Sequence, residues 1–128
     1  MKNTRAVVVD SSVWIEIFRR SPLGESCQSA LKGAKILVPT LVVAEVYRKL
    51  LKKASEPEAL DTVAFMMAQE IVQLSTEVAL LAADISNERG LAMADSIVLS
   101  HARLAAARLI TLDNDFAGLP DVEVLRSR

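Results

Sequence analysis

Residues 6–14 have the sequence Ala6-Val7-Val8-Val9-Asp10-Ser11-Ser12-Val13-Trp14, an apolar run that ends at a carboxylate. The β-branched run is typical of a strand buried on both faces in the middle of a parallel sheet. Asp10 would lie at the carboxyl end of that strand, where open α/β sheets place ligand-binding groups. Ser11 and Ser12 can both cap the helix that the apolar spacing from Val13 predicts. Asp10 is therefore the first candidate functional residue.

The bulk composition limits the classes of protein that this chain can belong to. A length of 128 residues indicates one domain, spanning residues 1–128 and built on a single core. With 52% hydrophobic and 24% charged residues, the chain is globular and not disordered. Aromatic residues make up only 4%, which argues against a base-stacking platform. The net charge of −1 requires any nucleic-acid affinity to come from a local patch.

The single cysteine and the N-terminal residues give expectations about the compartment. Cys27 is alone, which excludes an intrachain disulfide and a cysteine-based zinc site, and a buried thiol is its ordinary interpretation. Residues 1–5 are polar and lead directly into the first strand, without the apolar segment of a signal peptide. No window approaches the ~20 apolar residues of a membrane span. We expect a cytoplasmic protein that does not bind membranes.

Apolar periodicity predicts alternating strands and helices along the whole chain. The predicted strands are 6–9, 36–38, 71–74, 108–112 and 122–125, and the predicted helices are 13–20, 22–31, 41–53, 56–68, 76–89 and 96–107. Ser21, Thr40 and Asp95 precede three of these helices as candidate N-caps. Such alternation is typical of an α/β fold with a parallel sheet covered on both faces.

Four acids are predicted to reach the same edge of this sheet. Asp10 and Asp113 each follow a buried strand, and Asp95 begins the helix that leads into the strand ending at Leu112. Glu45 lies one turn inside a helix, among apolar neighbours. A solvated acid is not expected there, because an unpaired acid on an apolar face costs several kcal/mol.

Each of these acids also has a purely structural interpretation. Asp95 can be an N-cap, Asp113 and Asp115 can be turn residues, and Asp10 can be a capping turn residue. These separate interpretations do not explain why four different elements each place an acid at the same edge of the sheet.

Carboxylates gathered in this way need a compensating charge. Two like charges about 4 Å apart repel by roughly 4 kcal/mol at an effective dielectric constant near 20. No lysine or arginine is adjacent in sequence to any of the four acids. Oxygen ligands without histidine or cysteine favour Mg²⁺ or Mn²⁺ over zinc. An ion of this kind, held by carboxylates, is a common device for phosphodiester hydrolysis.

Four motifs, in this order, resemble those of the PIN-domain family and, within it, the VapC-type toxin ribonucleases of toxin–antitoxin pairs. They are Val8-Val9-Asp10-Ser11-Ser12-Val13, Val43-Ala44-Glu45-Val46, Leu91-Ala92-Met93-Ala94-Asp95-Ser96 and Ile110-Thr111-Leu112-Asp113-Asn114-Asp115-Phe116. The resemblance covers nearly the whole chain, and four motifs at suitable separations are far more specific than any one.

The resemblance implies a three-layer α/β/α sandwich with strand order 3-2-1-4-5 and an endoribonuclease that depends on Mg²⁺ or Mn²⁺. Its catalytic and metal-binding acids would be Asp10, Glu45, Asp95 and Asp113, with Asp115 as a fifth, outer acid. Ser12 and Thr111 match small hydroxyl residues that would orient a carboxylate or a bound water.

The resemblance also implies partners: an RNA substrate, a homodimer, and a small antitoxin whose C-terminal segment blocks the site. Trp14 and Phe18 could line the antitoxin groove, although ordinary core residues are the alternative. Candidate RNA contacts are Arg19, Arg20, Arg48, Lys49, Lys52, Lys53 and Arg89. A solvated helix face explains any one of them equally, and the cations of residues 48–53 also suit the end of a helix dipole. His101, about 240° around its helix from Asp95, receives no role.

Three other interpretations can be considered. A phosphoacceptor receiver domain would need paired acids after the first strand, an acid after the third and a lysine after the fifth. The chain has Ser11, Ser75 and Arg126 at these places, so all three expectations fail. A catalytically silent PIN-like binding module and a nuclease that cleaves DNA stay open at this point.

Overall fold

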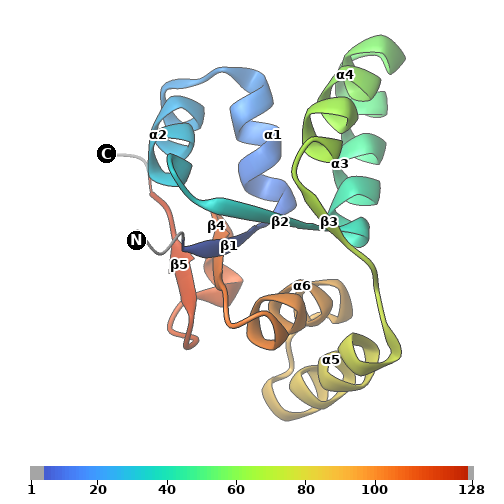
Figure 1. The fold of residues 1–128 in the computed structure, drawn as a ribbon, viewed down its shortest axis with the longest axis vertical. Helices are drawn as coiled ribbons and strands as arrows, with labels where there is room; N and C mark the ends of the chain where they lie inside the picture. The colour runs from blue at the N-terminus through green and yellow to red at the C-terminus, as the bar shows by residue number, and fades with distance from the viewer. Residues whose placement is uncertain (1–4, 127–128) are drawn as a thin grey trace.

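The computed structural model describes residues 5–126, which form a parallel five-stranded sheet between two layers of helices (Figure 1). The strands are β1 (Ala6–Val9), β2 (Lys35–Pro39), β3 (Glu70–Val72), β4 (Arg108–Thr111) and β5 (Val122–Val124). The helices are α1 (Ser11–Arg19), α2 (Pro22–Leu31), α3 (Thr40–Lys53), α4 (Glu56–Met67), α5 (Thr76–Arg89) and α6 (Met93–Leu104), with a short 3₁₀ helix η1 (Asn114–Phe116).

The sheet has the order β3-β2-β1-β4-β5, and every neighbouring pair is parallel. The central strand is β1, in which Val8 is paired with Leu37 on one side and Leu109 on the other. Its three valines are 0–1% exposed, as a strand covered on both faces requires. The predicted fold class and strand order are therefore confirmed. Because all strands run in the same direction, their carboxyl ends meet at one edge of the sheet.

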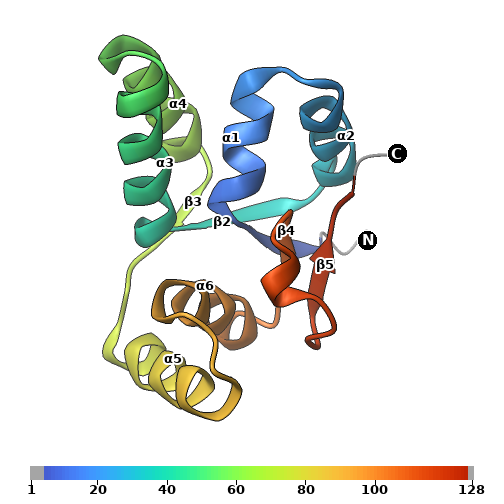
Figure 2. The ribbon, with the colours of Figure 1, turned by 180° about the vertical axis from the view of Figure 1, so that it is seen from behind.

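Helices α1 to α4 lie on one face of the sheet, and α5 and α6 lie on the other (Figures 1 and 2). The core between α1, α3 and the sheet contains Val13, Trp14, Val42, Val46 and Leu50, all at most 2% exposed. On the opposite face, α6 contributes Val98, Leu99 and Ala102. Cys27 is buried in the core, as predicted. None of the helices in residues 5–126 has the length and apolarity that crossing a membrane would take.

Three predicted caps are wrong. Ser11 and Ser12 lie inside α1, whose N-cap position is occupied by Asp10, and that side chain makes no capping hydrogen bond. Thr40 is the first helical residue of α3, after Pro39 at the N-cap position. Asp95 is the third residue of α6, not its cap, because the first turn closes earlier through a 2.9 Å bond from the Ser96 amide to the Ala92 carbonyl.

Other element boundaries move by two or three residues. Helix α6 ends at Leu104 instead of residue 107, because Ala106 adopts a left-handed conformation (φ 51°). In that turn the amide of Ala107 bonds to the Ala102 carbonyl at 2.8 Å. Strand β3 ends at Val72, which pairs with Pro39, the last residue of β2, so residues 73–74 have no strand partner there.

Candidate active site

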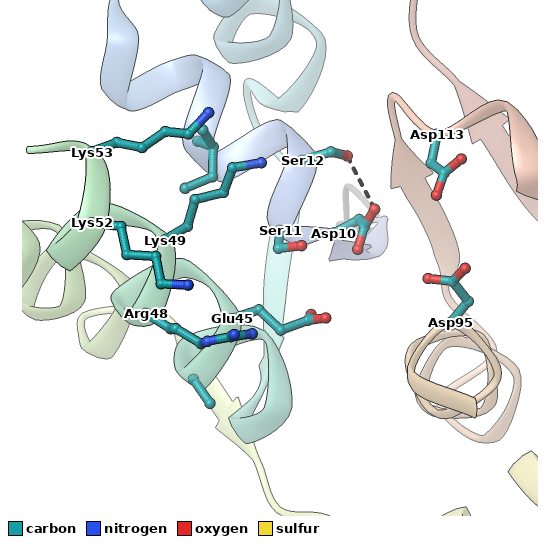
Figure 3. Close-up of a pocket in the computed structure, with 12 residues that line it drawn as sticks. Asp10, Ser11, Ser12, Glu45, Arg48, Lys49, Lys52, Lys53, Asp95 and Asp113 are labelled. Carbon is teal, nitrogen blue, oxygen red and sulfur yellow. Dashed lines mark hydrogen bonds between the residues drawn. The ribbon is translucent and has the colours of Figure 1, made fainter. Parts of the chain in front are cut away.

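A cavity of about 610 Å³ opens at the carboxyl ends of β1 and β4 (Figure 3). We call it the acid cavity, because its lining includes the four acids that the sequence singled out, Asp10, Glu45, Asp95 and Asp113. They come from the end of β1, from α3, from the first turn of α6 and from the residues after β4. The other lining residues are Ser11, Ser12, Ile15, Ala44, Arg48, Lys49, Lys52 and Lys53.

Asp10 is held in place by both its backbone and its side chain. Its amide donates to the carbonyl of Ile110 at 2.9 Å, which extends the pairing of β1 with β4. The hydroxyls of Ser12 and Thr111 donate to the same carboxylate oxygen, Oδ2, at 3.0 and 2.8 Å. The interpretation of Asp10 as a side-chain cap is therefore wrong, since its carboxylate bonds to these hydroxyls.

The two hydroxyls also bind the segment that carries Asp113. The Thr111 Oγ1 accepts a 3.0 Å bond from the Asp113 amide, and the Ser12 Oγ accepts a 3.1 Å bond from the Leu112 amide. Asp10 and Asp113 are thus connected through one threonine, which is fully buried. This network fixes the ends of β1 and β4 relative to each other.

Asp95, Asp113 and Asp115 form a close acidic group that could hold a metal ion. One carboxylate oxygen from each lies within 4.8 Å of the others. Asp113 does act as a turn residue, because its Oδ1 accepts a 2.9 Å bond from the Asp115 amide at the start of η1. Sequence reasoning gave Asp115 an outer position, whereas the structure places its carboxylate with those of Asp95 and Asp113. Asp115 is exposed, while Asp95 and Asp113 are half-buried.

Glu45 approaches the group from α3 and points toward Asp10 (Figure 3). Its Oε1 atom is buried and has no hydrogen-bond partner among the described residues. Such an oxygen is costly to leave unpaired, so a donor or a cation is expected beside it.

Burial and mutual repulsion disfavour ionisation at this site. Burial, followed by the charge of Asp113 and smaller effects of Asp10 and Asp115, raises the pKa of Asp95 to about 6. Burial also raises the pKa of Glu45, with added effects of the charges on Asp10 and Asp95. These shifts identify a site where negative charge is under-compensated, which is a frequent property of functional sites.

Four cations line the acid cavity; the sequence named all four as candidate RNA contacts but did not place them beside the acids. Arg48, Lys49, Lys52 and Lys53 follow Glu45 along α3 at helical spacing. Two ion pairs are found in residues 5–126, and they join Glu16 to Arg19 and Lys35 to Glu70. The four cations of the acid cavity therefore have no acid of residues 5–126 within 4.0 Å. Their position could have been predicted from the helical spacing, because residues three, four, seven and eight positions after Glu45 lie on the same face of the helix.

The residues present fit a hard divalent cation. The available donors are carboxylate oxygens, which Mg²⁺ and Mn²⁺ prefer. Oxygens that share one Mg²⁺ lie up to about 4.2 Å apart, given bond lengths of roughly 2.1 Å. The 4.8 Å group therefore requires only small side-chain adjustments to hold an ion.

Other predicted contact residues lie outside the acid cavity. Trp14, Phe18, Arg19 and Arg20 line a separate groove of about 800 Å³, together with Phe65 and other residues of α1, α2 and α4. We call it the helical groove. Trp14 is also a core residue, 2% exposed, and its ring meets that of Phe65 edge-on with centroids 6.0 Å apart. Arg89 lines none of the described cavities. His101 is buried in α6, outside the acid cavity.

Comparisons with known proteins agree with this geometry. The family profile described as "PIN domain" matches residues 7–122. A search of curated protein sequences returned no significant match. Among solved structures, a toxin–antitoxin complex from Klebsiella pneumoniae has a chain that is 23% identical, with a TM-score of 0.80 and coverage of 92% of this chain and 96% of that one.

Two Mycobacterium tuberculosis structures are also similar. VapC20, described as a sarcin-ricin-loop-cleaving toxin, is 16% identical with a TM-score of 0.76, covering 92% of this chain and 98% of that one. A chain of VapBC-5, from the VapBC family of toxin–antitoxin systems, is 25% identical with a TM-score of 0.68, and the match covers 95% of this chain and 98% of that one. The profile match spans most of the chain and includes all four motifs, and the fold and strand order agree with it. This chain therefore belongs to the PIN-domain family.

Proposed function

We propose that the protein is a metal-dependent endoribonuclease and the toxin of a type II toxin–antitoxin pair. The observation that carries this proposal is the acid cavity, where Asp10, Glu45, Asp95 and Asp113 meet without an ion pair among the described residues. Membership of the PIN-domain family and the likeness to toxins of toxin–antitoxin complexes support it.

In this proposal Asp95, Asp113 and Asp115 hold Mg²⁺ or Mn²⁺, with Asp10 and Glu45 completing the site on the opposite side of the cavity. When bound, such an ion lowers the pKa of a coordinated water and stabilises the charge that develops on the phosphate. Ser12 and Thr111 act as positioning residues, because both donate to Oδ2 of Asp10 and so restrain the orientation of its carboxylate. Cleavage leaves a 5′-phosphate and a 3′-hydroxyl.

The proposed partners are an antitoxin and a second copy of the chain. The helical groove has aromatic walls from Phe18 and Phe65, to which Trp14 adds little because it is 2% exposed, and such walls suit an amphipathic antitoxin segment. Exposed apolar side chains outside the acid cavity, Leu60, Met67, Leu80 and Met93, supply further surface for association. The protein is proposed to act in the cytoplasm on RNA.

The proposal is tested by incubating the purified protein with a panel of structured RNAs and matched DNAs, with Mn²⁺, Mg²⁺ or EDTA, and mapping the product ends. We expect RNA cleavage with either metal and none with EDTA. Asp10→Asn and Asp95→Asn should abolish cleavage while retaining the fold, whereas Asp84→Asn, an exposed acid on α5, should behave as wild type. Metal-dependent cleavage of DNA alone would contradict the RNA assignment. Absence of cleavage together with stable antitoxin binding would identify a silent binding module.

A further inference from the structure

A second cavity, of about 460 Å³, adjoins the acid cavity between α1 and α3. We call it the side cavity. The two cavities share four lining residues, Ser12, Ile15, Lys49 and Lys53, so each of these residues faces both spaces. The side cavity is completed by Glu16, Phe18, Arg19, Leu50 and Leu112. Its volume is in the range of small-ligand sites, roughly 300–1,000 Å³.

The lining of the side cavity is mixed, with polar and apolar side chains in similar share, and its boundary with the acid cavity is cationic. Its apolar surface comes mainly from Phe18 and Leu112, which are both half-buried. Ile15 and Leu50 add little to it, because they are 8% and 2% exposed. The charges of Glu16 and Arg19 already have partners, since they pair with each other at 4.0 Å and Glu16 accepts a 2.6 Å bond from Ser21.

Lys49 and Lys53 form the cationic boundary. They are four residues apart on α3, which places them on one helix face, and Figure 3 shows both extending toward α1. Neither makes an ion pair with another described residue. Arg48 and Lys52, one position earlier, line the acid cavity but not the side cavity.

This arrangement has the chemistry of a nucleotide site. The chain has too few aromatic residues for a platform that stacks several bases, but one ring with aliphatic neighbours accepts the face of a single base, and ammonium groups beside it bind the phosphate. We infer that the side cavity holds the base of the nucleotide next to the scissile phosphate, and that Lys49 and Lys53 bind the phosphate connecting that nucleotide to the acid cavity. This inference rests on the proposed function, because it assigns a binding position to the RNA substrate of the proposed nuclease.

The location of the base is tested by photocrosslinking in EDTA, where cleavage does not interfere. Short single-stranded RNAs with one 4-thiouracil at successive positions are irradiated with the full-length protein at low salt, and the crosslinked peptides are sequenced. We expect crosslinks from one position to Ile15, Phe18 or Leu112. Crosslinks confined to other surfaces would overturn the inference.

A binding experiment tests the contribution of the base. A fluorescein-labelled ten-nucleotide RNA should bind roughly tenfold more tightly than an abasic ribose-phosphate chain of the same length, by fluorescence anisotropy. Equal affinity for the two chains would show that no base is held.

Lysine variants test the contribution of the phosphate. Lys49→Ala with Lys53→Ala should weaken RNA binding and reduce the slope of log affinity against log salt by about 1.4, for two lost single-strand phosphate contacts. Lys32→Ala with Arg126→Ala removes the same charge from exposed positions outside all three cavities and should leave the slope unchanged. Equal effects of the two double variants would contradict the assignment.

The inference and the proposed function can fail separately. If the protein cleaves RNA with Mn²⁺ but its crosslinks lie elsewhere, the side cavity is not the base site and the nuclease assignment stands. If the protein neither binds nor cleaves any RNA of the panel, both are wrong.

Discussion

The hydroxyl of Thr111 donates a 2.8 Å hydrogen bond to Oδ2 of Asp10, which lies 101 positions earlier in the chain. The same hydroxyl oxygen accepts the amide of Asp113. One buried side chain therefore sets the orientation of one candidate metal ligand and the backbone of another. Because Ser12 donates to the same oxygen of Asp10, the carboxylate is fixed before any ion binds.

Thr111→Val keeps the shape of the side chain and removes this hydroxyl. We expect metal-dependent cleavage to fall by roughly 10- to 100-fold, because ligand orientation is lost. The Asp113 amide loses its acceptor, so the free energy of unfolding should also fall by about 1–3 kcal/mol. Cleavage assays and urea titrations measure the two effects. Thr111→Ser restores the hydroxyl and should recover most of the activity; a valine variant as active as wild type would contradict the positioning role.

Mg²⁺ or Mn²⁺ should raise the melting temperature, because the ion binds the assembled acids of the folded state. A thermal melt with and without millimolar metal measures the shift, and EDTA should reverse it. Asp113→Asn should abolish the shift, and Asp84→Asn should retain it. An unchanged wild-type melting temperature at saturating metal would count against the site.

Asp95→Asn should stabilise the metal-free protein at neutral pH. The pKa of Asp95 is raised to about 6, so the folded state holds its proton more tightly than the unfolded state does. The free energy of unfolding therefore falls as pH rises from about 4 to about 6, by about 1–2 kcal/mol once the solvent screening of this half-buried carboxyl group is allowed for. Asparagine cannot ionise and avoids this loss.

Urea titrations of the metal-free protein at pH 4 and pH 7.5 test this prediction. The variant should be more stable than wild type at pH 7.5 and nearly equal to it at pH 4. The control Asp84→Asn should show no such difference. A variant less stable than wild type at pH 7.5 would show that the ionised Asp95 is compensated within the protein.

Asp115→Asn separates metal binding from catalysis. Asp115 shares the 4.8 Å group with Asp95 and Asp113 but is exposed and does not line the acid cavity. We expect the Mn²⁺ concentration for half-maximal thermal shift to rise several-fold, with cleavage at saturating Mn²⁺ reduced far less than in Asp10→Asn. A loss of cleavage that saturating Mn²⁺ does not relieve would assign Asp115 a direct role in the reaction.

Gly24→Ala should destabilise the packing of α1 against α2. A Cβ atom at this buried position would lie 2.9 Å from the carbonyl carbon of Glu16 and 3.2 Å from the Cα of Ile17, so the two helices would have to separate. We expect a loss of about 1–3 kcal/mol in the free energy of unfolding, measured by urea titration. Ser26→Ala, at an exposed position of the same helix, should change it little; a neutral Gly24→Ala would show that the contact is looser than described.

Local sequence patterns were sufficient to predict most of the architecture. The valine run before Asp10 gave the central strand, and the apolar spacing around Glu45 gave α3 with an acid on its inner side. The predicted boundary was wrong at the start of α6, where the N-cap residue is Ala92. Its side chain cannot form a capping hydrogen bond, so the sequence carries no sign of this boundary.

The sequence by itself determined which acids reach the edge of the sheet. In a parallel sheet all strands end at the same edge, so Asp10, directly after β1, and Asp113, two residues after β4, both lie at that edge. The strand order, which places β1 beside β4, then brings the two acids together. Only the tertiary structure decided which atoms face each other: Asp115 beside Asp95, Thr111 on Asp10, and Lys49 and Lys53 between two cavities. These relationships depend on how helices pack across the sheet, and such long-range contacts leave no periodic signal in the chain.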